Sequence, residues 1–81
     1  MPKVFEWNGY KFFFFSNEGN PVEPCHIHVR KGGNIAKFWI GDIVILDSSW
    51  GMSSKELSSL ESRIEEQREL IMEKWDEFFN K

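Results

Sequence analysis

The sequence predicts an α+β domain, an antiparallel β-meander of about four to five strands followed by one long C-terminal helix packed on one sheet face. Up to Ser48, short runs of β-branched and aromatic residues alternate with turn residues, a pattern typical of strands. From Ser53 onward, apolar residues recur at three- and four-residue steps, which is the period of a helix. Short connections between consecutive strands favour antiparallel pairing. A chain of 81 residues is expected to form a single domain, residues 1–81.

The first two predicted strands form a hairpin. Residues 3–7 have strand composition, and Asn8-Gly9 follows them. Both turn residues tolerate positive φ angles, so the pair favours a tight type I′ turn. Residues 10–16 are predicted to form the returning strand, and the consecutive phenylalanines Phe12–Phe15 place aromatic rings on both of its sides. We therefore expect this strand to be covered on both faces.

Three further strands follow a loop predicted at residues 17–24, which is rich in proline, glycine and asparagine. Residues 25–30 alternate strictly between apolar and polar side chains, as in a strand with one buried face. Residues 35–40 and 43–47 also have strand composition, and turns containing glycine separate these strands. The pattern breaks over residues 48–52, where we predict the connection to the helix.

The predicted helix begins with a capping signal. Ser53 is a favourable N-cap, and Glu56 three residues later completes a capping box. One apolar stripe with a single polar interruption follows, and it consists of Leu57, Leu60, Ile64, Gln67, Ile71, Trp75 and Phe78. The charged residues lie on the opposite, solvated side. A break near residues 65–68, which would give two helices, is the alternative to one continuous helix.

Charge and composition exclude several classes of protein. Residues 1–54 carry equal numbers of basic and acidic side chains, so the net charge of -3 arises entirely in residues 55–81. The chain has no overall excess of basic residues, and nucleic-acid binding is therefore not favoured. No apolar run is long enough to span a membrane, and no secretion signal is recognisable. The lone Cys25 excludes an intrachain disulfide and fits a reducing compartment, so we expect a cytoplasmic protein.

The histidines are the main candidates for chemistry. His26 and His28 are two residues apart on a predicted strand, so their rings should lie on one face with Cα atoms roughly 6.5–7 Å apart. Such a pair can ligate a metal or act as general acid and base, and Arg30 on the same face can hold an anion. A half-exposed strand with its polar side in water gives the same pattern. We expect neither a metal nor a cofactor, because no third ligand is near and Cys25 points to the other face.

The chain also resembles a known family. The segments that carry the resemblance are Met1-Pro2, Pro24-Cys25-His26-Ile27-His28-Val29 and Glu73-Lys74-Trp75. In their order, and in the size of the chain, they resemble the bacterial family of domain of unknown function 4160, which usually has a second proline where this chain has Cys25. The resemblance implies a small cytoplasmic protein, often encoded beside another small protein in toxin–antitoxin-like pairs. It implies no reaction, but it directs attention to His26 and His28.

Two functional hypotheses follow. In the first, the protein is a binding module whose sheet face around His26, His28 and Arg30, with Lys37 and Trp39 as further binding residues, docks a partner protein or a second copy of the chain. In the second, it is a small metal-independent nuclease or phosphodiesterase. His26 and His28 would then be acid and base, and Arg30 or Lys37 would stabilise the developing negative charge. If Phe13, Phe15 or Trp39 lie uncovered beside the histidines, that surface is where function is expected.

Overall fold

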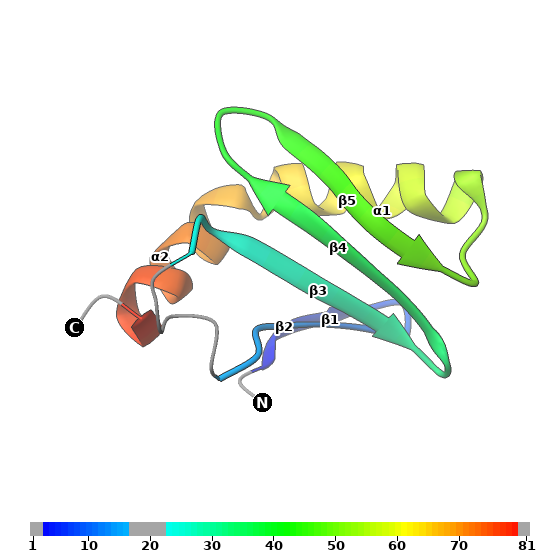
Figure 1. Cartoon of the computed structure of the whole chain (residues 1–81), viewed down its shortest axis with the longest axis horizontal. Coiled ribbons are helices and arrows are strands. Elements are labelled where there is room, and N and C mark those ends of the chain that lie inside the picture. The colour runs from blue at the N-terminus through cyan, green and yellow to red at the C-terminus, as the bar shows by residue number, and fades with distance from the viewer. Residues whose placement is uncertain (1–2, 17–22, 80–81) are drawn as a thin grey trace.

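The molecule is a five-stranded antiparallel sheet with two helices on one side (Figure 1). A computed structural model describes residues 3–16 and 23–79. The strands pair in sequence order, and each pair is antiparallel. The predicted α+β meander is thus confirmed, and the alternative of a broken helix is the one that the structure adopts. The elements are β1 (Lys3–Trp7), β2 (Tyr10–Phe13), β3 (His26–Lys31), β4 (Asn34–Ile40), β5 (Val44–Trp50), α1 (Ser54–Glu66) and α2 (Arg68–Phe79).

The β1–β2 turn forms as its sequence predicts. Asn8 and Gly9 have φ angles of 50° and 81°, and Trp7 pairs with Tyr10 across the turn. Positive φ at both central positions is the requirement of a type I′ turn, which matches the twist of the flanking strands. The hairpin register then sets Phe5 beside Phe12 on the face toward the helices, where their rings stack with centroids 4.2 Å apart.

Two strand boundaries differ from the prediction. β2 ends at Phe13 and not at residue 16, because Phe13 already pairs with Lys3 at the start of β1. β5 continues through Ser48 and Ser49 to Trp50, where a connection was expected. Pairing with the long strand β4 holds this serine-containing segment in the sheet, since Ser48 lies opposite Lys37 and Trp50 opposite Ile35. The predicted loop at residues 17–24 lies largely outside the described residues.

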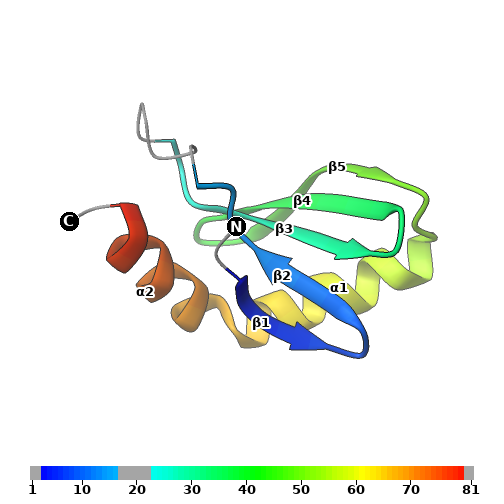
Figure 2. The same cartoon turned by 90° about the horizontal axis from the view of Figure 1, so that it is seen from below.

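The core lies between the sheet and the two helices. Each inner strand contributes alternate side chains to it, and both helices contribute apolar side chains as well. The helices lie below the sheet in Figure 2. Burying one large apolar side chain contributes about 1.5–3 kcal/mol, so a dense aromatic core supplies the stability that a small domain without a disulfide needs. The buried members are Tyr10, Phe12, Phe14, Ile27, Val29, Ala36, Phe38, Ile40, Val44, Leu60, Ile64, Ile71 and Trp75.

The helical segment begins as predicted and breaks at Gln67. The side chain of Ser53 accepts from the backbone N–H of Glu56, and the Glu56 carboxylate accepts from the backbone N–H of Ser53. At Gln67 the N–H donates to the carbonyls of both Arg63 and Ile64, and the first helix ends. Arg68, at the start of α2, donates to the carbonyl of Gly41 and so ties α2 to the turn between β4 and β5.

The aromatic residue at the end of α2 that reaches the core is not the one that the sequence predicts. The predicted stripe ended at Phe78, but Phe78 is 41% exposed. Phe79 packs against the core in its place, because Ile71, Trp75 and Phe79 are spaced by four residues on one side of α2. No described helix has the length and apolarity that crossing a bilayer requires.

Candidate functional site

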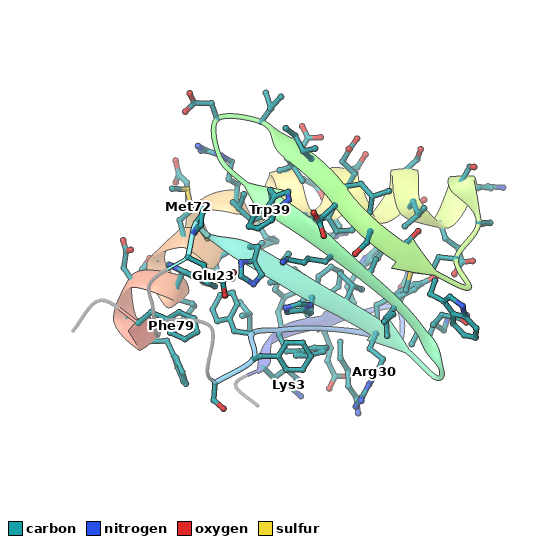
Figure 3. All side chains as sticks on the ribbon, in the orientation of Figure 1. Lys3, Glu23, Arg30, Trp39, Met72 and Phe79 are labelled. Carbon is teal, nitrogen blue, oxygen red and sulfur yellow. The ribbon has the colours of Figure 1, made fainter. Side chains whose placement is uncertain are left out.

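The sheet face away from the helices is the candidate site, and we call it the open face. Neither helix lies over it in Figure 2, and Figure 3 shows Trp39 and Arg30 at opposite ends of it. Strand alternation and register bring its residues together from all five strands. The side chains on the open face are Lys3, Glu6, Lys11, Phe13, Phe15, His28, Arg30, Ile35, Lys37, Trp39, Ile45, Asp47, Ser48 and Trp50.

His28 lies near the centre of this face, between two aromatic rings. It pairs with Phe13 on β2 and with Lys37 on β4. The Phe13 ring stacks on the imidazole with centroids 5.7 Å apart and an interplanar angle of 27°. Phe15 approaches the same imidazole more closely, at 4.3 Å. Of the two phenylalanines beside His28, Phe15 is 39% exposed whereas Phe13 is buried, and the side chain of His28 is half-buried.

A pocket of about 310 Å³ opens beside His28. Its size is at the lower end of the range for small-ligand sites, and most of its wall is apolar, with His28, Lys37 and Ser48 as polar side chains. Three of its residues belong to the part of β5 that the sequence did not predict as strand, so the pocket could not be assembled from the sequence alone. It is lined by Phe13, Phe15, His28, Val29, Ile35, Ala36, Lys37, Ser48, Ser49 and Trp50.

His26 has a different environment from His28. Its side chain is fully buried, and its Nδ1 lies 2.9 Å from the carbonyl oxygen of Pro24. Because a carbonyl oxygen can only accept, Nδ1 carries the proton and donates it. The imidazole packs at 5.2 Å from Trp39 and 5.0 Å from Trp75 of α2. The two histidine rings are neighbours as expected, 5.2 Å apart, but only His28 lines the pocket.

The predicted binding residues Lys37 and Trp39 form one fixed unit at the β4–β5 side of the open face. The Lys37 ammonium lies over the Trp39 ring, 4.3 Å from its centroid. The indole N–H of Trp39 donates to Asp47 at 2.9 Å, and the hydroxyl of Ser48 donates to the other carboxylate oxygen at 3.2 Å. Asp47 therefore orients the indole, which in turn supports the cation of Lys37.

The predicted residue Arg30 lies at the other end of the open face, in a basic corner. Lys11 and Arg30 are directly opposite each other on β2 and β3, and the Arg30 guanidinium is 5.9 Å from the Phe13 ring. Lys3 borders the same shallow groove of about 190 Å³ and pairs with Glu6, whose pKa is lowered by that hydrogen bond. Like charges directly across a strand pair repel, so an anion bound in this corner would relieve the repulsion.

Cys25 lies outside this site. Its side chain is half-buried and packs against the core on the helix side of the sheet, as the alternation of β3 predicts. Burial is the main cause that raises the pKa of its thiol to about 12, and the charge of Asp76 adds to it. A thiol that stays protonated at neutral pH is a poor nucleophile. Within residues 3–16 and 23–79, no group of three or more potential metal ligands is found.

A comparison with protein families identifies the relatives of the chain. The family model of a domain of unknown function, DUF4160, matches residues 9–76. The chain belongs to the DUF4160 family. This match includes β2 to β5, α1 and most of α2, so the pocket and both histidines fall within the DUF4160 domain. No curated protein matches the chain, and no solved structure matches it either.

Proposed function

We propose that this DUF4160 protein is a small binding module whose open face docks an acidic partner protein. The separation of charge between its two sides supports this most strongly. The cations Lys3, Lys11, Arg30 and Lys37 outnumber Glu6 and Asp47 on the open face. The segment that contains both helices, residues 55–81, carries the net charge of -3. A surface of opposite sign on the partner would match the open face and repel the helical side.

The pocket supplies an anchor for such a partner. Protein interfaces obtain most of their affinity from a few apolar or aromatic side chains that fill pockets, within a polar rim. The pocket beside His28 is lined mostly by apolar residues, and Lys37 is a charged residue of its lining. We therefore expect the partner to insert an apolar side chain here and to place carboxylates near Lys37 and Arg30.

The partner is a different protein rather than a second copy laid face to face. Two open faces in contact would bring the cations of both copies together and bury like charges. The toxin–antitoxin-like arrangement implied by the family resemblance offers a source for the partner, the small protein encoded beside this one. A reducing compartment such as the cytoplasm suits the single thiol of Cys25.

The alternative function, a nuclease with His26 and His28 as acid and base, has less support. A general acid or base must come within hydrogen-bond reach of the substrate. His26 is fully buried, and its Nδ1 proton is already donated to Pro24. The same packing gives His26 a structural role between the sheet and Trp75.

Site-specific photo-crosslinking tests the proposal. A photo-reactive benzoylphenylalanine replaces Phe15, which is 39% exposed on the open face, or Phe78, which is 41% exposed on α2, as the control. In cells that express the neighbouring gene, we expect a discrete adduct with one acidic protein at position 15 and none at position 78. Adducts with nucleic acid at position 15, or the same adducts at both positions, would overturn the proposal.

Purified components then test which charges matter. Lys37→Glu and Arg30→Glu should each weaken binding of the crosslinked partner by about tenfold or more, as loss of a complementary charge followed by repulsion predicts. Lys55→Glu on α1 is the matched control, since it makes the same change of charge on the helical side. It should leave the dissociation constant unchanged. Equal weakening by all three substitutions would show a nonspecific charge effect and contradict docking on the open face.

A further inference from the structure

The outer edge of β5 is an unpaired strand edge. β5 is last in the strand order, so no strand of the described residues lies on its outer side. It is seven residues long, and every residue except Val44 is exposed. The backbone N–H and C=O groups along such an edge are available to another strand, and proteins commonly block them.

The opposite edge of the sheet has the usual protection. β1 is shorter, it has a bulge between Lys3 and Phe5, and it carries the charges of Lys3 and Glu6. β5 also has an irregularity, and its one charged residue is Asp47. The Asp47 carboxylate accepts from Trp39 and Ser48, however, so it is turned across the open face and does not project from the edge. The edge of β5 is therefore the less protected of the two.

Apolar side chains gather along this unprotected edge. Four large hydrophobic residues on or beside β5 are substantially exposed: Ile43 at 67%, Ile45 at 50%, Leu46 at 37% and Trp50 at 68%. Beneath them, the groove between β5 and α1 is bordered mostly by apolar or small uncharged side chains. Along this edge, the surfaces of β5 and of α1 are thus both apolar and nearly uncharged, whereas the open face is basic.

We propose that a second copy of the chain covers this edge, with β5 pairing antiparallel to β5 of the other copy around a two-fold axis. An antiparallel strand pair is self-complementary, so one apolar edge suffices for both partners. The acidic partner of the proposed function would meet no cation along β5. The register must keep the open faces of both copies on the same side of the extended sheet. In such a register, Leu46 lies opposite Ser49 of the second copy, and Ile45 lies opposite Trp50 of the second copy.

The dimer joins the two candidate sites. A two-fold axis perpendicular to the sheet keeps both open faces on one side and both helical layers on the other. Ser48, Ser49 and Trp50 line the pocket and belong to β5, so the two pockets become neighbours across the new strand pair. One extended sheet then presents two equivalent binding sites side by side, which raises the avidity for a partner with two matching segments.

Sedimentation equilibrium tests the dimer with the protein alone. The wild-type chain should have twice the monomer mass of 9.6 kDa at concentrations above about 10 µM. Ile45→Lys places a charge on the β5 margin and should give a monomer. Phe78→Lys makes the same change at an exposed residue of α2 and should remain a dimer. A monomeric wild type, or a dimeric Ile45→Lys variant, would overturn the proposal.

Disulfide trapping tests the register. The double variant Leu46→Cys, Ser49→Cys should form a covalent dimer on mild oxidation, whereas Leu46→Cys alone should not. The native Cys25 does not compete, because burial raises the pKa of its thiol to about 12. A covalent dimer of the single variant would overturn this register. None of these measurements uses the acidic partner, so their failure would leave the proposed function untouched, and failure of the crosslinking would leave the dimer untouched.

Discussion

The imidazole of His26 lies against the indole of Trp75, with ring centroids 5.0 Å apart, and joins the first residue of β3 to the middle of α2. On its other sides the same imidazole contacts Trp39 and donates to the carbonyl of Pro24. One side chain thus fastens the end of the sheet to the second helix. The neighbouring histidine, His28, contacts the rings of Phe13 and Phe15 and lines the pocket instead.

His26→Ala should destabilise the protein strongly, and His28→Ala should not. Removing His26 opens a buried cavity and leaves the Pro24 carbonyl without this donor, which we expect to cost about 2–4 kcal/mol. His28 is half-buried, and its loss should cost about 1 kcal/mol or less. Urea unfolding of both variants measures the difference. Equal losses of unfolding free energy would contradict the structural assignment of His26.

Phe79→Ala should destabilise the protein more than Phe78→Ala, although the sequence pattern favours the reverse. Phe79 packs on Trp75 and Phe14, with centroids at 4.3 and 5.9 Å. We expect a loss of about 1–3 kcal/mol for Phe79→Ala and less than about 1 kcal/mol for Phe78→Ala. Thermal unfolding of the two single variants compares them directly. The opposite order would show that α2 is rotated relative to its position here.

Glu56→Gln should lower the pKa of Tyr10. The phenol O–H donates to Glu56 at 2.7 Å, and this hydrogen bond is the main cause that raises the pKa of Tyr10 above its usual value. Tyr10 is the only tyrosine in the chain, so the ultraviolet absorbance of the phenolate reports it alone. The midpoint of the absorbance change on titration with base should lie above pH 10 in the wild type, and it should be lower in Glu56→Gln. An unchanged midpoint would contradict the hydrogen bond.

The same variant should change how stability depends on acid. The backbone N–H of Ser53 is the main cause that lowers the pKa of Glu56, and Tyr10 adds to it. A carboxyl group with a lowered folded-state pKa stabilises the protein above its unfolded pKa of about 4.3, and that contribution is lost as the pH falls through the folded-state pKa. Wild type should therefore be more stable than Glu56→Gln at pH 7, and the difference should shrink as the pH falls through the lowered pKa of Glu56. A constant difference across this range would contradict the lowered pKa.

Cys25 should resist thiol reagents while the protein is folded. With a pKa of about 12, its thiol is almost entirely protonated at pH 8. Labelling by a disulfide reagent should be slower than that of an ordinary exposed cysteine by about 100-fold or more. The same protein in guanidinium chloride, where the burial is lost, is the control and should react at the ordinary rate. Rapid labelling of the folded protein would contradict the burial of this thiol.

The sequence predicts local features of the fold better than those that depend on distant partners. The Asn8-Gly9 turn, the capping box at Ser53 and the two faces of β3 follow from adjacent residues, and the structure contains all three. The burial of His26 depends on Trp75, which is far away in the sequence. The extension of β5 depends on pairing with β4, because serines have little strand preference of their own.

The candidate site was predictable in composition but not in shape. Arg30, Lys37, Trp39 and His28 were named from the sequence, and all four lie on the open face. The pocket also needs Ser48, Ser49 and Trp50, whose strand was not predicted. The alternation of side chains along a strand correctly predicts that His26 and His28 lie side by side. It does not predict that α2 packs against the ring of His26 and that His28 lines the pocket.

The separation of acidic helices from a basic sheet face makes the molecule an electric dipole. The electric field of an acidic partner orients such a molecule as the two proteins approach each other. A larger share of encounters therefore begins with the open face toward the partner. At an ionic strength of 0.1 M, dissolved ions screen this electrostatic attraction at distances beyond roughly 10 Å. Added salt should therefore slow the association of the complex far more than it speeds its dissociation, and partner capture would be rapid at low ionic strength even if the final complex is of modest affinity.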